Sequence, residues 1–225
     1  MKIAIHQPAY LPWAGYFHKI RSVDLFIFLD NVQFQKGSFQ NRNQIYSKHG
    51  PIWLTVPMLT SNGYFKEKIL DLKIDNNQKW QLKHLKSICN NYSKAPMFKT
   101  ILPKIEGFYL NKQENLSELC WDMLHVFNEI LGIKTPIIRA SEMQSLNGKK
   151  SNLILDICKS TKASVYLSGD NGRDYLVGED FQDSGIIIQY QNYKIKDYKQ
   201  LGDGFTPALG IVDLLFNSDF PIEYI

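Results

Sequence analysis

Short apolar runs alternate along this chain with segments whose apolar residues recur at helical spacing. Residues 3–5 and 25–29 are apolar runs of strand length, and residues 11–22 between them combine a turn with a helical pattern. A strand, a helix and a second strand of this kind form a βαβ unit, whose strands run parallel in the interior of a sheet. The pattern therefore predicts a buried βαβ unit at the start of the chain.

The same alternation continues to the end of the chain. Residues 51–57 predict a strand closed by proline, and the alternating polarity of residues 69–74 predicts a sheet-edge strand. A helical block is expected at about residues 76–131, where residues 116–131 carry an apolar stripe that ends at Gly132. Further strands are expected at residues 137–140, 163–167 and 185–190, and further helices at residues 152–161 and 208–216. The predicted fold is one α/β domain over residues 1–225, Rossmann-like, with a mostly parallel sheet flanked by helices and an inserted helical block.

Composition narrows the class of protein. The chain has 225 residues, 44% of them hydrophobic and 21% charged, which suits one compact domain. Its formal net charge of +4 is spread along the sequence, without the Lys/Arg block of a nucleic-acid-binding protein. The three cysteines form no C-x-x-C pair and indicate reduced thiols. No secretion signal and no apolar run of about 18 residues is visible. We therefore expect a cytoplasmic protein with no membrane span and no metal site.

Polar side chains follow the first two strands at the points where these strands end. His6 and Gln7 follow the first strand, and Asp30 and Gln33 follow the second. In open α/β sheets, ligands bind at this carboxyl edge. His6 could contact a phosphate or shuttle a proton, or simply bond to a loop carbonyl. Asp30 could orient a hydroxyl or an amine. His6 and Asp30 are the candidate catalytic residues, and Gln7 and Gln33 are candidate binding residues.

The segment after Asp30 supplies an arginine. Arg42, followed by Asn43, offers a guanidinium fork suited to a carboxylate or a phosphate. The alternative is an ion pair between Arg42 and Asp30 that holds the loop shut. Arg42 and Asn43 are candidate binding residues.

Aromatic residues gather around the two prolines of the first loop. Tyr10 and Trp13 could stack on a sugar or a base, although Trp13 could equally pin the helix onto the sheet. Lys19 could reach the same ligand site at the end of the first strand, or it could lie on a solvated face of the helix. All three are candidate binding residues.

A second polar loop, SGDNGRDYL, follows the strand at residues 163–167. Its glycines permit close backbone approach, and Arg173 adds a cation. Asp174 and Tyr175 either belong to the site or cap the next helix. The loop lacks G-x-G-x-x-G and G-K-[ST], and the chain lacks G-x-S-x-G, so covalent catalysis is not expected. The candidate binding residues in this loop are Ser168, Gly169, Arg173, Asp174 and Tyr175.

Several segments together resemble the WbqC-like protein family: HQPAYLPWAGYFHKI, DLFIFLDNVQFQKGSFQNRNQI, WLTVP, YLSGDNGRDYL and the tail FTPALGIVDLLFN. The resemblance spans nearly the whole chain. It implies a place in O-antigen or other surface-polysaccharide biosynthesis, with a suggested glycine-transferase role. The layout is also distantly similar to the nucleotidylyltransferase-like α/β superfamily, which includes pantothenate synthetase. This chain has His6 and His18 but not that superfamily's close H-x-G-H pair.

The leading hypothesis is a transferase that adds an aminoacyl (glycyl-like) or other small acyl group to a nucleotide-linked amino sugar. His6 would move a proton or hold a phosphate, Asp30 would orient the acceptor, and Arg42 and Arg173 would hold anionic groups. ATP or another activated acyl donor would be the co-substrate. The alternatives are a non-catalytic nucleotide-sugar-binding protein of the same pathway and, since D-x-D is absent, a metal-independent glycosyltransferase. Contact with tRNA is possible but has no support in the sequence. The sequence does not determine the oligomeric state.

Overall fold

A five-stranded parallel sheet forms the base of the structure, a computed structural model that describes residues 1–59, 67–144 and 146–225. Its strands are β1 (Lys2–His6), β2 (Leu25–Phe28), β5 (Ile137–Arg139), β6 (Val165–Ser168) and β7 (Ile187–Tyr190). They lie in the order β5-β2-β1-β6-β7, and each neighbouring pair is parallel. Counted along the chain, this is the order 3-2-1-4-5 of a doubly wound Rossmann-like sheet. The predicted fold class is confirmed.

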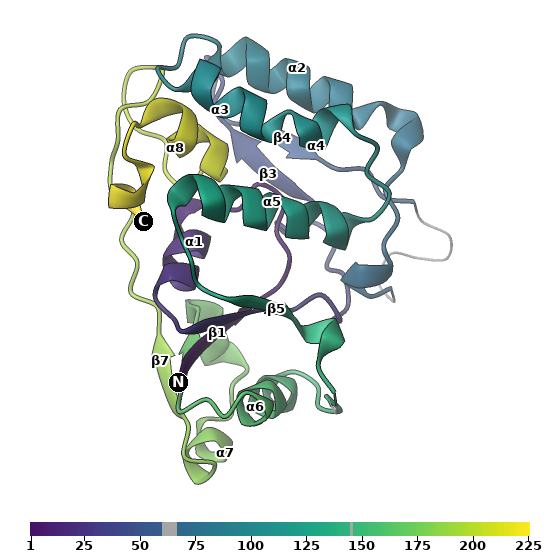
Figure 1. The fold of residues 1–225 in the computed structure, drawn as a ribbon, viewed down its shortest axis with the longest axis vertical. Helices are drawn as coiled ribbons and strands as arrows, with labels where there is room; N and C mark the ends of the chain where they lie inside the picture. The colour runs from purple at the N-terminus through teal and green to yellow at the C-terminus, as the bar shows by residue number, and fades with distance from the viewer. Residues whose placement is uncertain (60–66, 145) are drawn as a thin grey trace.

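Helices cover both faces of this sheet. Successive side chains of a strand point to opposite sides, and here both sets are apolar and need a packing partner. Ala4 and Phe26 face the core that also contains α1 (Ala14–Arg21) and α5 (Leu116–Leu131). Ile3 and Ile27 face a second core beneath α6 (Ser151–Ser160) and α7 (Gly178–Asp183). Figure 1 shows α1 and α5 on one side of the strands and α6 and α7 on the other. The strands are thus apolar on both faces, which explains why they appear as continuous apolar runs.

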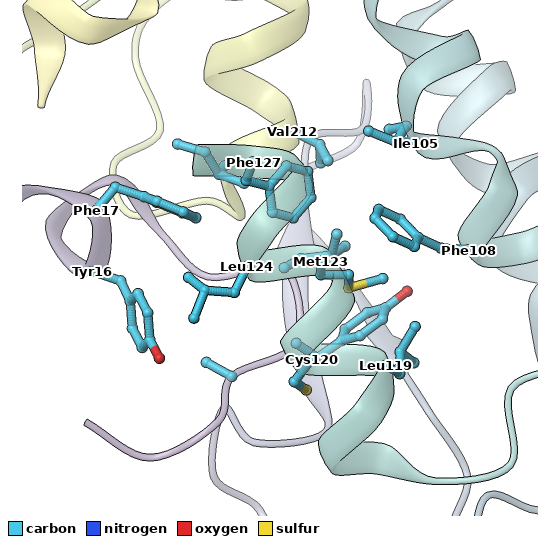
Figure 2. Packing of buried hydrophobic residues seen from close by; sticks show 14 of the residues in the cluster. Tyr16, Phe17, Ile105, Phe108, Leu119, Cys120, Met123, Leu124, Phe127 and Val212 are labelled. Atoms are coloured by element: carbon cyan, nitrogen blue, oxygen red, sulfur yellow. The ribbon is translucent and has the colours of Figure 1, made fainter. Parts of the chain in front are cut away.

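The helix α5 is the centre of the larger core. It begins after Asn115, whose side chain accepts a hydrogen bond from Glu118 N at 3.1 Å, and it ends at Gly132 with φ 68°. Figure 2 shows its buried residues packed between Phe17 of α1 and Phe108 of the opposite layer. The prediction of a helix over residues 116–131 is confirmed residue for residue.

A second layer lies on the far side of α5 from the sheet (Figure 1). It consists of α2 (Trp80–Tyr92), α3 (Phe98–Ile105), α4 (Gly107–Leu110), α8 (Ile211–Asn217) and an antiparallel hairpin of β3 (Arg42–Ile45) and β4 (Ile52–Thr55). The expected helical block at residues 76–131 thus corresponds to α2 through α5, and the predicted strand at residues 51–57 belongs to the hairpin rather than to the parallel sheet.

The prediction of an edge strand at residues 69–74 is wrong. Ile69–Asp71 forms a short 3₁₀ helix, closed by a hydrogen bond from Leu72 N to Ile69 O at 3.2 Å, and Lys73 and Ile74 form isolated β-bridges. The turn replaces the extended backbone that a strand over these residues would require.

Within the described residues, no helix combines the length and the apolar character needed to cross a membrane.

Candidate functional site

The strand order reverses its direction between β1 and β6, at the middle of the sheet. The chain winds from β1 through β2 to β5 on one side, and through β6 to β7 on the other. In doubly wound sheets the loops diverge at such a switch point, and ligands bind beyond the carboxyl ends of the two strands. We call this region of the protein, beyond the ends of β1 and β6, the crevice. His6 is the last residue of β1, and Ser168 is the last residue of β6. The structure therefore brings the two polar loops of the sequence to adjacent strand ends.

Lys19 is the cation of this crevice. It lies on the buried face of α1 and is 4% exposed. Its Nζ is 3.0 Å from the position that a β-carbon would take on Gly169, directly after β6. Among the described residues no Asp or Glu forms an ion pair with it. Burial lowers the pKa of Lys19 from 10.5 to about 8, against the opposing effect of Asp170. An ammonium group held this way is suited to bind an anion.

His6 is neutral and has a defined tautomer. Its Nδ1 is 3.0 Å from Gln7 O, and because a carbonyl only accepts, this nitrogen carries the proton and Nε2 is an acceptor. Burial, and next the charge of Lys19, lower the pKa of His6 to about 3, although the Gln7 carbonyl opposes this. The ring packs edge-on against Tyr16, with 4.6 Å between the ring centroids. His6 can thus accept a hydrogen bond from a ligand beside Lys19.

Gln7 connects this crevice to the segment after β2. Its backbone carbonyl accepts a hydrogen bond from the hydroxyl of Tyr16 at 3.2 Å. Its side-chain carbonyl accepts one from Nε2 of Gln40 at 2.6 Å. Gln40 is 3% exposed, so this contact fixes the loop over residues 35–41 next to the end of β1.

The loop after β6 is tightly packed at its base and exposed at its tip. Ser168 Oγ donates to Gly169 O at 2.9 Å, and a β-carbon on Gly172 would lie only 2.0 Å from that Oγ. The guanidinium of Arg173 lies 3.7 Å from the ring centroid of Tyr190, the last residue of β7, and its Nε is 3.8 Å from the Asp170 carboxylate. Arg173 therefore stands at the rim of the crevice, while Asp174 and Tyr175 are exposed beyond it.

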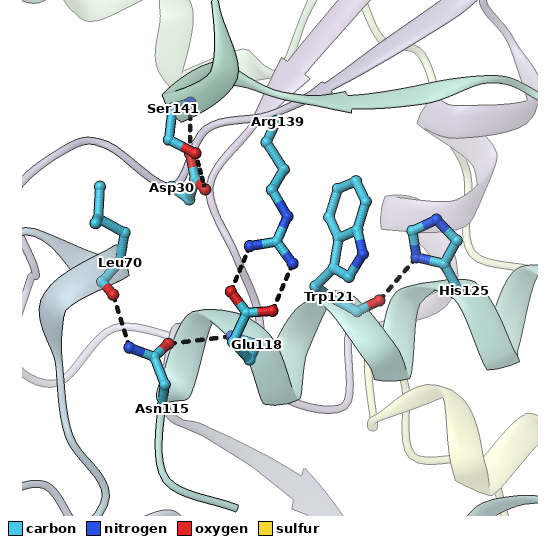
Figure 3. A network of polar contacts seen from close by, with 8 residues as sticks. All are labelled: Asp30, Leu70, Asn115, Glu118, Trp121, His125, Arg139 and Ser141. Carbon is cyan, nitrogen blue, oxygen red and sulfur yellow. Dashed lines mark hydrogen bonds and ion pairs between the residues drawn. The ribbon is translucent and has the colours of Figure 1, made fainter.

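Asp30 lies at the same edge of the sheet but is fully buried. Its two carboxylate oxygens accept hydrogen bonds from Ser141 N at 2.9 Å and Ser141 Oγ at 2.7 Å (Figure 3). Beside it, Arg139 forms two hydrogen bonds with Glu118 and covers the ring of Trp121, 4.3 Å from its centroid. Asp30 thus joins the ends of β2 and β5, with each carboxylate oxygen bonded to Ser141.

Tyr10 lies in the core, away from the crevice. It is fully buried, with its hydroxyl 2.8 Å from Nδ1 of His84 and 3.2 Å from the hydroxyl of Tyr109. Burial raises the pKa of Tyr10 and lowers that of His84 to about 4. Neither ring offers a free face to a sugar.

Trp13, Asn43 and Gln33 also have structural partners. Trp13 packs against Tyr193 at a centroid distance of 5.5 Å. Asn43 donates to Leu11 O at 2.6 Å, and Gln33 is exposed and forms a β-bridge with Lys68. The structure does not bring these three residues to the crevice.

Arg42 stands on the hairpin and does not pair with Asp30. It donates to Gly37 O and lies over Trp53, with its guanidinium carbon 4.4 Å from the ring centroid. The alternative of a closing ion pair with Asp30 is therefore wrong.

Tyr16, one of the aromatic residues around the two prolines of the first loop, lies beside His6. Gln40 and Gln191 were missed by sequence reasoning. Gln191 follows β7, as His6 ends β1, and its Nε2 donates to Gly15 O at 2.7 Å. That position after a strand was a usable signal, whereas no pattern in the sequence distinguishes Gln40. Within the described ranges, no cluster of three or more His, Cys, Asp or Glu side chains is placed to bind a metal.

The fold and the crevice define a Rossmann-like α/β protein that carries, at the switch point of its sheet, a neutral histidine and a nearly buried lysine without an ion-pair partner among the residues described. Comparison with known proteins agrees with the whole-chain resemblance. The chain belongs to the WbqC-like protein family, whose model matches residues 7–221. It is 37% identical over 218 residues to the uncharacterized protein Rv1507c of Mycobacterium tuberculosis, covering 96% of this chain and 93% of that protein. No solved structure matches the chain.

Proposed function

We propose that the protein is a transferase that adds an aminoacyl, glycyl-like, or other small acyl group to a nucleotide-linked amino sugar. Surface-polysaccharide biosynthesis, on the cytoplasmic side, is the pathway associated with its family. The observation that carries the proposal is Lys19: a nearly buried ammonium beside Gly169, with no carboxylate partner among the described residues. Such a group is stabilised when a ligand phosphate enters the crevice, because the anion offsets the cost of burying the charge.

His6 supplies the proton acceptor in this proposal. The sugar amine attacks the carbonyl carbon of the acyl donor, a C–N bond forms, and the bond from that carbon to the donor's leaving group breaks. Nε2 of His6 accepts the proton that the nitrogen loses. A phosphate next to Lys19 cancels part of the positive charge that depresses the pKa of His6, so ligand binding makes His6 a stronger base. Asp30 acts indirectly, by holding the strand ends in place.

One observation favours a second candidate function, that of a non-catalytic nucleotide-sugar-binding protein. In the free protein the pKa of His6 is about 3, which is far below the value that suits a general base at neutral pH. A neutral histidine is nevertheless a good hydrogen-bond acceptor for a sugar hydroxyl.

The test is a mass-spectrometric assay of the purified protein with a panel of nucleotide-linked amino sugars and three donor mixtures: glycine with ATP, glycyl-tRNA and acyl-coenzyme A. We expect one combination to give the mass increase of an acyl group, lost in His6→Gln. The second function, a non-catalytic binding protein, would be supported if no combination gave turnover and the nucleotide sugar alone produced a thermal shift. Neither turnover nor binding would refute both functions.

A further inference from the structure

Two large aromatic side chains are exposed next to the crevice, on the hairpin and on the loop that precedes it. Phe39 is 55% exposed and Trp53 is 44% exposed. Their ring centroids are 5.8 Å apart and their planes are inclined by 39°. The guanidinium of Arg42 borders them, 4.4 Å from the centroid of Trp53. We call these three side chains the aromatic shelf.

We propose that the aromatic shelf binds the base of a nucleotide-linked ligand whose phosphates lie toward Lys19. This inference rests on the proposed function, because it assigns the nucleoside end of the same ligand. An apolar ring surface of this size is costly to expose to water, and a flat base can cover it. The inclination of the two rings leaves no parallel slot between them, so the base would lie across the shelf instead of being inserted.

The shelf adjoins the crevice through two hydrogen bonds. Tyr10 N donates to Phe39 O at 3.1 Å, and the next residue, Gln40, donates to the Gln7 side chain at 2.6 Å. Gln7 directly follows His6. The loop that carries Phe39 is therefore bonded to the segment that follows β1, and the proposed ligand extends along this contact from Lys19 to the shelf.

The loop that carries Phe39 is held in its conformation by hydrogen bonds within the loop and to Arg42. Gln40 Oε1 accepts a hydrogen bond from Gln35 N at 2.9 Å, and Ser38 Oγ donates to Gln35 O at 2.7 Å. Arg42 donates to the carbonyl of Gly37, which adopts φ 81°. Because these contacts fix the loop before binding, little conformational entropy is lost when a ring stacks on it.

Charge favours an anionic ligand over a neutral one. Residues 31–59 contain Lys36, Arg42 and Lys48 but no Asp or Glu. Arg42 also has a buried Nε with no hydrogen-bond partner in the described part of the chain. Two aromatic rings and an arginine, on a segment without acidic residues, together fit a ligand that joins a planar base to phosphates.

The experiment measures binding of a panel of nucleoside diphosphates and of inorganic pyrophosphate to the full chain by isothermal titration calorimetry. For the best nucleoside diphosphate we expect Phe39→Ala and Trp53→Ala each to raise Kd about tenfold, since stacking of one base is worth roughly 1–3 kcal/mol. Pyrophosphate should bind these variants as it binds the wild type. Phe220→Ala, at another exposed aromatic side chain, is the matched control and should change neither Kd.

Two further variants separate the shelf from the anion site. Lys19→Met should weaken binding of pyrophosphate and nucleoside diphosphate alike. Trp53→Phe, which keeps a ring, should retain affinity within about threefold of wild type while it loses the tryptophan quenching that a stacked base produces.

The shelf would be overturned if Phe39→Ala and Trp53→Ala left the Kd for nucleoside diphosphates unchanged while Lys19→Met abolished binding. The proposed function would then still stand. Binding of no nucleoside diphosphate to the wild type would overturn both. Shelf-dependent binding of single-stranded RNA without binding of free nucleotides would overturn the shelf as a nucleotide subsite and assign it to nucleic acid.

Discussion

Replacing Lys19 by methionine is expected to stabilise the free protein at neutral pH, although it removes the proposed anion site. Lys19 is 4% exposed and forms no ion pair among the described residues, so folding removes its ammonium from water with only the partial compensation that Asp170 provides. Methionine has a similar length and no charge. The substitution should therefore relieve the desolvation cost and keep most of the packing along α1.

The size of the effect follows from the pKa. The pKa of Lys19 falls from 10.5 to about 8 on folding, which at about 1.4 kcal/mol per pH unit corresponds to roughly 3 kcal/mol. Below pH 8 both states carry the proton and the full cost applies. Between pH 8 and 10.5 the folded state releases its proton before the unfolded state does, so the stability of the wild type rises with pH. Above that range the cost is gone.

Urea unfolding at pH 7 and pH 10 measures this difference. Lys19→Met should exceed the wild type in free energy of unfolding by up to about 3 kcal/mol at pH 7, and by much less at pH 10. Lys86→Met, at an exposed position of α2, is the matched control and should give the same small difference at both pH values. A Lys19→Met variant that is less stable than the wild type at pH 7, or a gap that does not depend on pH, would refute the reasoning.

Three further predictions concern the same edge of the sheet. Nitrogen-detected NMR should show His6 neutral, with its proton on Nδ1, down to about pH 3. Because His6 takes up its second proton near pH 6.5 in the unfolded chain but only near pH 3 in the folded protein, the free energy of unfolding should fall as the pH drops through this range. The fall should be smaller in His6→Gln. Asp30→Asn should lower the free energy of unfolding by about 1–3 kcal/mol in urea titrations, because an amide cannot accept both hydrogen bonds from Ser141. Gly172→Ala should cost about 1–3 kcal/mol in the same assay, since its β-carbon would lie 2.0 Å from Ser168 Oγ.

The elements that could be predicted are those whose spacing of apolar residues reveals which side is buried. The helix over residues 116–131 buries one side along its whole length and ends at a glycine, so its bounds follow from spacing alone. The strand β3, whose sequence is Arg-Asn-Gln-Ile, carries no apolar pattern. It forms because Asn43 bonds to Leu11 O and β4 pairs alongside, and neither contact is visible in the sequence.

The contrast between local patterns and long-range contacts also explains which residues of the candidate site could be predicted. His6 and Ser168 could be placed at one edge because parallel strands end on the same side of a sheet. Tyr10 could not be assigned, because its burial depends on His84 of α2, 74 residues away. Phe39 and Trp53 were not predicted because an exposed aromatic residue in a sequence looks the same as a buried one.

Lys19 and His6 together explain why the crevice is arranged as it is. A stable fold would place a leucine or a methionine at position 19, and a strong base would require a histidine that is not buried beside a cation. Both unfavourable terms occur at the switch point of the sheet, at the ends of β1 and β6. Both are relieved by the same event, because an anion that enters beside Gly169 stabilises the ammonium and at the same time raises the proton affinity of His6. Under the proposed function, binding of a ligand phosphate would therefore offset this cost at neutral pH and couple occupancy of the crevice to the basicity of His6.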